Sequence, residues 1–117
     1  MGIMEQFLQI TTTTASREEA QIIARHLVGE KLAACVQILG PINSTYHWKG
    51  NIETADEWLC LIKTRAALYG KVEKAIRSLH SYETPEIIAT MISKGNIDYL
   101  RWLDHEIMPA ASEKKHA

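Results

Sequence analysis

The chain has 117 residues, a mass of 13.2 kDa, 46% hydrophobic and 23% charged residues, and a net charge of −1. This length fits a single domain over residues 1–117, and the composition excludes disordered, collagen-like and coiled-coil chains. The balance of 13 basic and 14 acidic residues gives no reason to expect a nucleic-acid partner.

The sequence also predicts where the protein acts. No apolar run reaches the roughly eighteen residues that cross a bilayer, and the residues before Phe7 lack the basic start of a secretory signal. Cys35 and Cys60 are the only cysteines, too few for a secreted disulfide framework. We therefore expect a cytoplasmic protein with reduced thiols and no membrane insertion.

The first elements are a strand and a helix. Residues 6–13 are rich in β-branched side chains, which is typical of a strand. Ser16 and Glu19 have the spacing of a capping box, and apolar residues then repeat along one helical face. Gly29 is the natural C-cap of this helix.

A long hairpin is predicted next. Residues 32–39 form an apolar extended run, Gly40-Pro41 interrupts it as a bulge or bend, and residues 42–48 continue it. Residues 49–51 have the composition of a hairpin turn, and residues 52–64 are the return strand.

The second half of the chain predicts a helix, a strand and a last helix. The apolar stripe of residues 66–80 is helical, and Pro85 ends the loop that follows. Residues 86–93 form a strand, and Asn96 caps a helix that Pro109 ends. The core then spans about residues 5–108, and residues 109–117 are a polar tail.

The order β-α-β-β-α-β-α predicts an α+β fold, the ferredoxin-like split βαβ sandwich, with a long hairpin between its second and third strands. Its two main helices cover only one face of the sheet. Residues 32–39 and 58–62 are apolar at both strand parities, so both faces need cover. We expect other subunits to cover the second face.

Catalytic motifs are absent: the sequence has no Walker A loop, G-x-G-x-x-G, CxxC pair or H-E-x-x-H. An acylphosphatase-like hydrolase is the enzyme alternative for this fold, but it needs a phosphate-binding loop with an arginine after the first strand. Threonines occupy positions 11–14, and Arg17 falls in the first helical turn. We therefore predict a protein that is not an enzyme.

A set of motifs spread over residues 6–107 carries a resemblance to a known family. They are Glu19-Ala20, Ile23-Ala24, Leu32-Ala33-Ala34-Cys35-Val36, Ser44, Tyr46, Trp48, Gly50, Lys63-Thr64, His80, Tyr82, Thr84-Pro85-Glu86, Tyr99-Leu100 and Trp102-Leu103. In this order the chain resembles the CutA family of divalent-cation tolerance proteins. The resemblance implies a homotrimer built like the PII signalling proteins, and tolerance to copper and other divalent metals, with Cu(II) bound by some members.

His80 is the candidate metal ligand that the resemblance implies. Cu(II) favours imidazole and thiolate donors. Some family members place a second histidine and a cysteine nearby, where this chain has Leu79 and Thr12. The structural alternative is that His80 only interacts with the last carbonyls of its helix.

A ligand or interface cleft between subunits is the second candidate site. Glu57 and Lys63 share one face of their strand, and Lys63 either pairs with a carboxylate such as Glu83 or binds an anionic ligand. The candidate cleft residues are Cys35, Tyr46, Trp48, Glu57, Lys63, Tyr82 and Glu83. The alternative is that these residues only hold the trimer together.

Two functions follow from these sites. The first is a trimer that responds to divalent metal ions such as copper by binding a metal or another ligand. The alternative is a PII-like module that binds a small molecule or a protein at clefts between subunits. The sequence favours binding over catalysis in both.

Overall fold

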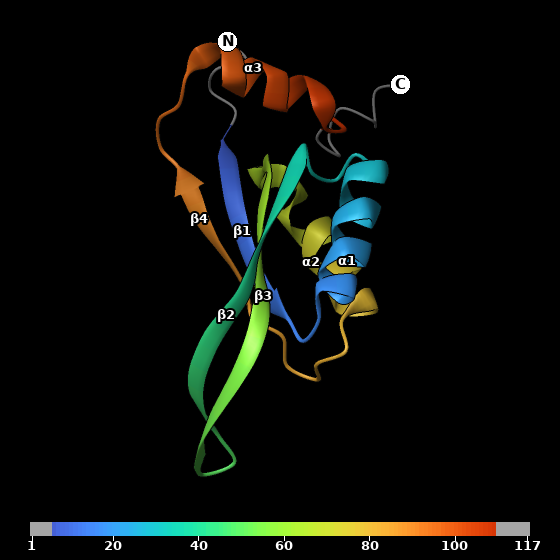
Figure 1. Cartoon of the computed structure of the whole chain (residues 1–117). Coiled ribbons are helices and arrows are strands. Elements are labelled where there is room, and N and C mark those ends of the chain that lie inside the picture. Colours follow the sequence, from blue (N-terminus) through green and yellow to red (C-terminus); the bar gives the residue numbers. More distant parts are fainter. Residues whose placement is uncertain (1–5, 110–117) are drawn as a thin grey trace.

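A computed structural model describes residues 6–109, which contain one four-stranded antiparallel sheet (Figure 1). Its strands lie in the order β2-β3-β1-β4 and are β1 (Phe7–Thr14), β2 (Cys35–Trp48), β3 (Asn51–Arg65) and β4 (Ile87–Ile92). The helices are α1 (Arg17–Gly29), α2 (Tyr69–Leu79), which follows a 3-10 turn at Ala66–Leu68, and α3 (Ile97–Glu106). The predicted order of elements is confirmed. Most of the predicted polar tail lies outside the described residues.

The start of α1 is as predicted, but its end is not. The Ser16 hydroxyl accepts a hydrogen bond from the backbone N–H of Glu19 at 3.1 Å. Gly29 is the last helical residue rather than the cap, and Glu30 takes the C-cap position. Lys31 then adopts the left-handed conformation, with φ 58°, that was expected of a glycine.

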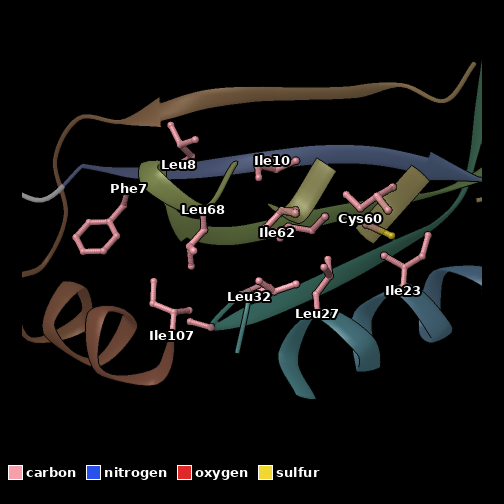
Figure 2. Packing of buried hydrophobic residues seen from close by; sticks show 14 of the residues in the cluster. Phe7, Leu8, Ile10, Ile23, Leu27, Leu32, Cys60, Ile62, Leu68 and Ile107 are labelled. Atoms are coloured by element: carbon pink, nitrogen blue, oxygen red, sulfur yellow. The ribbon is translucent and has the colours of Figure 1, made fainter. Parts of the chain in front are cut away.

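Helices α1 and α2 both cover one face of the sheet, and the core lies between them and the strands (Figures 1 and 2). Ile10, Cys60 and Ile62 point from the strands into this core and are fully buried. Ile23 and Leu27 of α1 meet them from the helix layer. Burying each of these large side chains stabilises the fold by about 1.5–3 kcal/mol, so this layer dominates the stability of the subunit.

Helix α3 lies across one end of the sheet (Figure 1) and is anchored by a buried arginine. The Arg65 side chain donates hydrogen bonds to the Asp104 carboxylate at 2.9 Å and to the Met108 carbonyl at 3.0 Å. Leu103 and Ile107 provide the apolar side of this contact. The third helix is therefore part of the core domain.

The β2–β3 hairpin extends beyond the rest of the molecule (Figure 1). Its two-residue turn is Lys49-Gly50, both at positive φ, as hairpin turns of this length require. The expected interruption is a register shift between Leu39 and Ile42. Gly40 is needed there, because a Cβ at this position would lie 2.3 Å from Cδ1 of Trp58.

The second face of the sheet carries apolar side chains. No helix of residues 6–109 covers the central part of this face. Leu39, Leu59, Leu61 and Ile88 share this surface, called the open face below, because cross-strand partners point to the same side. Leu39 is 48% and Ile88 55% exposed. The predicted uncovered surface is present. In the part of the chain that the structure describes, no helix is long and apolar enough to span a membrane.

Candidate functional site

A cleft of about 710 Å³ lies between the long hairpin and the loop after α2. It is bounded by the end of β1, by β2 and β3, and by the loop between α2 and β4. The residues that line it are three carboxylates, three aromatic side chains and five hydroxyl-bearing side chains: Glu57, Glu83, Glu86, Tyr46, Trp48, Tyr82, Thr13, Ser44, Thr45, Ser81 and Thr84. No basic side chain from residues 6–109 lines it, so the lining is acidic and aromatic.

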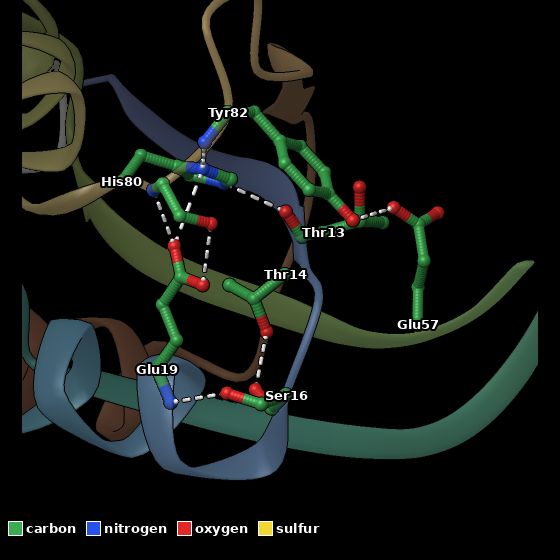
Figure 3. A network of polar contacts seen from close by, with 8 residues as sticks. Thr13, Thr14, Ser16, Glu19, Glu57, His80 and Tyr82 are labelled. Carbon is green, nitrogen blue, oxygen red and sulfur yellow. Dashed lines mark hydrogen bonds and ion pairs between the residues drawn. The ribbon is translucent and has the colours of Figure 1, made fainter.

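Glu57 is the buried carboxylate of the cleft lining, and a tyrosine is hydrogen-bonded to it (Figure 3). The Tyr82 hydroxyl donates a hydrogen bond to Glu57 Oε2 at 2.7 Å. Burial raises the pKa of Tyr82, and the hydrogen bond to the Glu57 carboxylate and its charge raise it further. The phenol therefore stays protonated and fixes the orientation of the carboxylate.

His80 positions Tyr82 from the other side (Figure 3). The His80 Nδ1 atom accepts a hydrogen bond from the backbone N–H of Tyr82 at 3.1 Å. This assigns the proton to Nε2, which donates to the Thr13 carbonyl at 2.7 Å. The histidine thus ties the loop after α2 to the end of β1.

Glu19 completes this latch, defined as Glu19, His80 and Ser81. Its carboxylate accepts hydrogen bonds from the backbone N–H of Ser81 at 2.7 Å and from the Ser81 hydroxyl at 2.9 Å. One carboxylate oxygen also lies 3.3 Å from His80 Nδ1. The latch fixes the loop that carries Tyr82 to the start of α1.

Metal ligation by His80 is not supported by its contacts. Both ring nitrogens are used, and the side chain is fully buried. Within residues 6–109, no three or more His, Cys, Asp and Glu side chains gather in a way that could hold a metal ion. A metal ligand must offer a free lone pair, and neither ring nitrogen has one. The structural alternative also needs correction, because His80 binds the Thr13 carbonyl of β1 and the Tyr82 N–H rather than the last carbonyls of its own helix.

Burial also sets the chemistry of Cys60. Burial raises the pKa of its thiol to about 11, and the charge of Glu19 adds to the effect. At neutral pH it is a protonated core side chain and not a thiolate ligand.

Five of the seven predicted cleft residues do come together: Tyr46, Trp48, Glu57, Tyr82 and Glu83. Lys63 and Cys35 do not line this cleft of the single chain, and their place at a cleft between subunits stays a prediction. Lys63 Nζ donates to Gln37 Oε1 at 2.6 Å and does not pair with Glu83. Cys35 Sγ lies 3.7 Å from the Tyr99 hydroxyl, below α3.

Lys63 lies away from this cleft because of its distance from Glu57 along the strand. Lys63 and Glu57 are on the same face, as predicted, but six residues separate them, which is roughly 20 Å in an extended chain. An even spacing along a strand predicts that two side chains share a face. It does not predict which part of that face the loop after α2 covers.

Glu19 and Glu86 are the charged residues at the site that the sequence analysis does not predict, and the five hydroxyl-bearing side chains of the lining are not predicted either. Glu19 was assigned to a capping box, in which its side chain would turn back to the N-cap residue. It reaches Ser81 instead. The sequence gives little indication of this contact. Glu19 is a carboxylate that can accept hydrogen bonds from many groups, and 62 residues separate it from Ser81.

A four-stranded antiparallel sheet in the order β2-β3-β1-β4, with two helices on one face, defines the class of ferredoxin-like split βαβ proteins. In this chain the hairpin of β2 and β3 is long (Figure 1), and an acidic, aromatic cleft lies between it and the loop after α2. The family model described as CutA1 divalent ion tolerance protein matches residues 8–106. The chain belongs to this family.

Relatives named divalent-cation tolerance protein CutA agree with the family model. The one from Archaeoglobus fulgidus is 41% identical over 104 residues, 89% of this chain and 99% of the relative. The one from Thermus thermophilus is 42% identical over 100 residues, 86% of this chain and 95% of the relative. The chain therefore matches these relatives over nearly their whole length.

Solved structures of the family show the same fold. The divalent cation tolerance protein from Thermus thermophilus superposes with a TM-score of 0.85 at 38% identity, covering 87% of this chain and 99% of that one. CutA1 from Oryza sativa gives a TM-score of 0.86 at 36% identity, covering 88% and 94%. The ferredoxin-like fold predicted from the sequence is confirmed.

Proposed function

We propose that the protein acts as a homotrimer in the response to divalent metal ions such as copper, and that it acts by binding an ion or a ligand rather than by catalysis. The family description names tolerance to divalent ions and no reaction. The observation that carries the trimer is the open face. A sheet surface with Leu39 and Ile88 half exposed is unfavourable in a monomer.

The shape of the subunit supports closed assembly. The hairpin extends away from the body, and its outer strand, β2, has only one sheet neighbour. An unpaired strand edge beside an apolar surface favours pairing with another copy. Cyclic symmetry limits that pairing to a small closed oligomer, for which we propose three subunits.

Binding rather than catalysis is supported by the cleft. Its described lining has carboxylates, hydroxyls and aromatic rings, and the hydroxyl–carboxylate contacts there, Tyr82 to Glu57 and Ser81 to Glu19, hold the loop after α2 in place. Oxygen donors suit hard divalent cations better than they suit copper, which favours imidazole and thiolate. A copper response would then depend on donors that assembly brings together, and the PII-like ligand module remains the alternative function of the same cleft.

The location we propose is the cytoplasm. Cys60 and Cys35 are both free, which suits a reducing compartment. A relative of known structure, from Archaeoglobus fulgidus, is by contrast named a periplasmic divalent cation tolerance protein.

A growth test examines assembly and tolerance together. In a host whose own CutA-type gene is deleted, the wild-type chain should restore growth at raised copper. Leu61→Asp places a charge on the open face and should abolish this rescue, because the trimer no longer forms. Ile22→Asp is the matched control, since Ile22 is 55% exposed on α1, in the opposite layer. Equal rescue by a monomeric Leu61→Asp protein would exclude the trimer as the functional unit.

A further inference from the structure

The Glu57 carboxylate is a buried charge that lacks a counter-ion. The residue is 7% exposed, although it faces the cleft. In the described range, 6–109, no Lys, Arg or His nitrogen lies within 4.0 Å of it, and its one hydrogen-bond partner is the neutral Tyr82 hydroxyl. A buried carboxylate is normally paired with a cation, because desolvation of an unpaired charge is costly. Glu57 belongs to the lining, so a cation in the cleft would lie beside it.

The other charged side chains of the cleft are also acidic and favour a positively charged ligand. Glu83 and Glu86 add two more carboxylates, and no basic side chain of the described chain lines the space. An anionic ligand would therefore meet only repulsion from the charged groups.

The aromatic side chains indicate an organic cation rather than a bare ion. Tyr46 and Trp48 line the cleft and are 43% and 45% exposed, so they offer apolar ring faces to an occupant. The Trp48 ring already has the Lys49 ammonium 5.7 Å from its centroid, near enough for a cation–π contact. The described residues offer no cluster of three ligating side chains for a metal, and about 710 Å³ is the size of a small-molecule site.

We propose that this cleft binds an organic cation, an alkylammonium or guanidinium group on an apolar stem. The cationic group lies beside the Glu57 carboxylate, which Tyr82 orients. The stem lies against the exposed rings of Tyr46 and Trp48. The cation is either a free small amine or the Lys or Arg side chain of a neighbouring copy. This goes beyond the proposed role in metal tolerance, and it rests on the proposed assembly only where a neighbouring copy supplies the cation.

Isothermal titration calorimetry of the full chain tests the proposal, with agmatine and putrescine as the organic cations and MgCl₂ and CuSO₄ as metal probes. We expect saturable binding of an organic cation, weakened roughly tenfold or more in Glu57→Gln, because the charge-assisted contact is lost. Tyr82→Phe should weaken it less. The matched control is Glu53→Gln, an exposed carboxylate on the same face of β3 that does not line the cleft. Circular dichroism confirms that each variant is folded.

The two sources of the cation give different results. A free ligand gives a saturable heat in the wild type and roughly tenfold or more weaker binding in Glu57→Gln, with the oligomer mass unchanged. A side chain from a neighbouring copy gives no heat in the wild type, while Glu57→Gln, but not Glu53→Gln, lowers the oligomer mass measured by light scattering. Binding of metal ions alone at Glu57 would overturn the proposal, as would the absence of organic-cation binding together with an unchanged oligomer. The growth test at raised copper is a separate measurement, so either of these two results would overturn the organic-cation proposal and leave the proposed metal response to be judged by that test.

Discussion

The hydrogen bond between Tyr82 and Glu57 makes stability depend on pH in the alkaline range. Burial and the Glu57 carboxylate raise the pKa of Tyr82 in the folded state above its ordinary value of 10.0. The folded protein holds this proton more tightly than the unfolded chain does. The stabilisation is therefore fully present below about pH 10 and is lost as the pH rises through the folded pKa.

Replacing this tyrosine tests the sign of the effect. We expect Tyr82→Phe to be less stable than the wild type at pH 8, and the difference in the free energy of unfolding to shrink above pH 10. Urea denaturation at several pH values measures both. Tyr46→Phe serves as the control, because the Tyr46 hydroxyl has no hydrogen-bond partner among residues 6–109. A difference that grows with pH would contradict the assignment.

The two cysteines should differ sharply in reactivity. Cys60 is fully buried, and its raised pKa, about 11, leaves almost no thiolate at neutral pH. Cys35 is partly exposed. With Ellman's reagent at pH 7.5, the native protein should release at most one fast thiol equivalent, which Cys35→Ser removes, and Cys60 should react only in denaturant. Equal rates for both thiols would show that the core around Cys60 opens readily.

Residue types predict five of the six charged and aromatic side chains of the cleft, but not its limits. Tyr46, Trp48 and Glu57 were found because large or ionisable side chains stand out on a paired strand. Lys63 does not line this cleft, because parity gives the face and not the position along it. The Glu19–Ser81 contact was out of reach, since it depends on how a loop packs against a helix far away in the sequence.

At the scale of elements, the latch holds the loop between α2 and β4 onto α1 and β1. His80→Ala leaves the Thr13 carbonyl and the Tyr82 N–H without their partner, which should cost about 1–3 kcal/mol in the free energy of unfolding. Because both ring nitrogens are used inside the subunit, the number of Cu(II) ions bound should not change. Denaturation and a Cu(II) titration followed by electron paramagnetic resonance give the two results. Loss of nitrogen hyperfine splitting without a loss of stability would restore His80 as a metal ligand.

The elements themselves were largely predictable. Ser16 and Asn96 accept the backbone N–H bonds expected of N-caps, and Gly50 lies in the hairpin turn that its neighbours indicated. Gly29 misled the prediction by one residue, because Lys31 tolerates the left-handed conformation instead. The role of Gly40 was only half visible: the sequence indicates a break, whereas the contact with Trp58 requires the folded hairpin.

At the scale of the whole molecule, the subunit has a complete core on one side of its sheet and an unfinished surface on the other. Leu59 and Leu61 lie behind the fully buried Cys60 and Ile62, so the same strand serves two layers. The sequence pattern predicted this, because an apolar strand at both parities needs cover twice. The three copies that we propose depend on the rotation between neighbouring chains, which no single-chain pattern encodes.

Light scattering during size-exclusion chromatography of the wild-type chain tests this account most directly. We expect one peak with three times the subunit mass of 13.2 kDa, unchanged on dilution. A peak at the mass of a single subunit, with the protein folded and the open face in water, would contradict it.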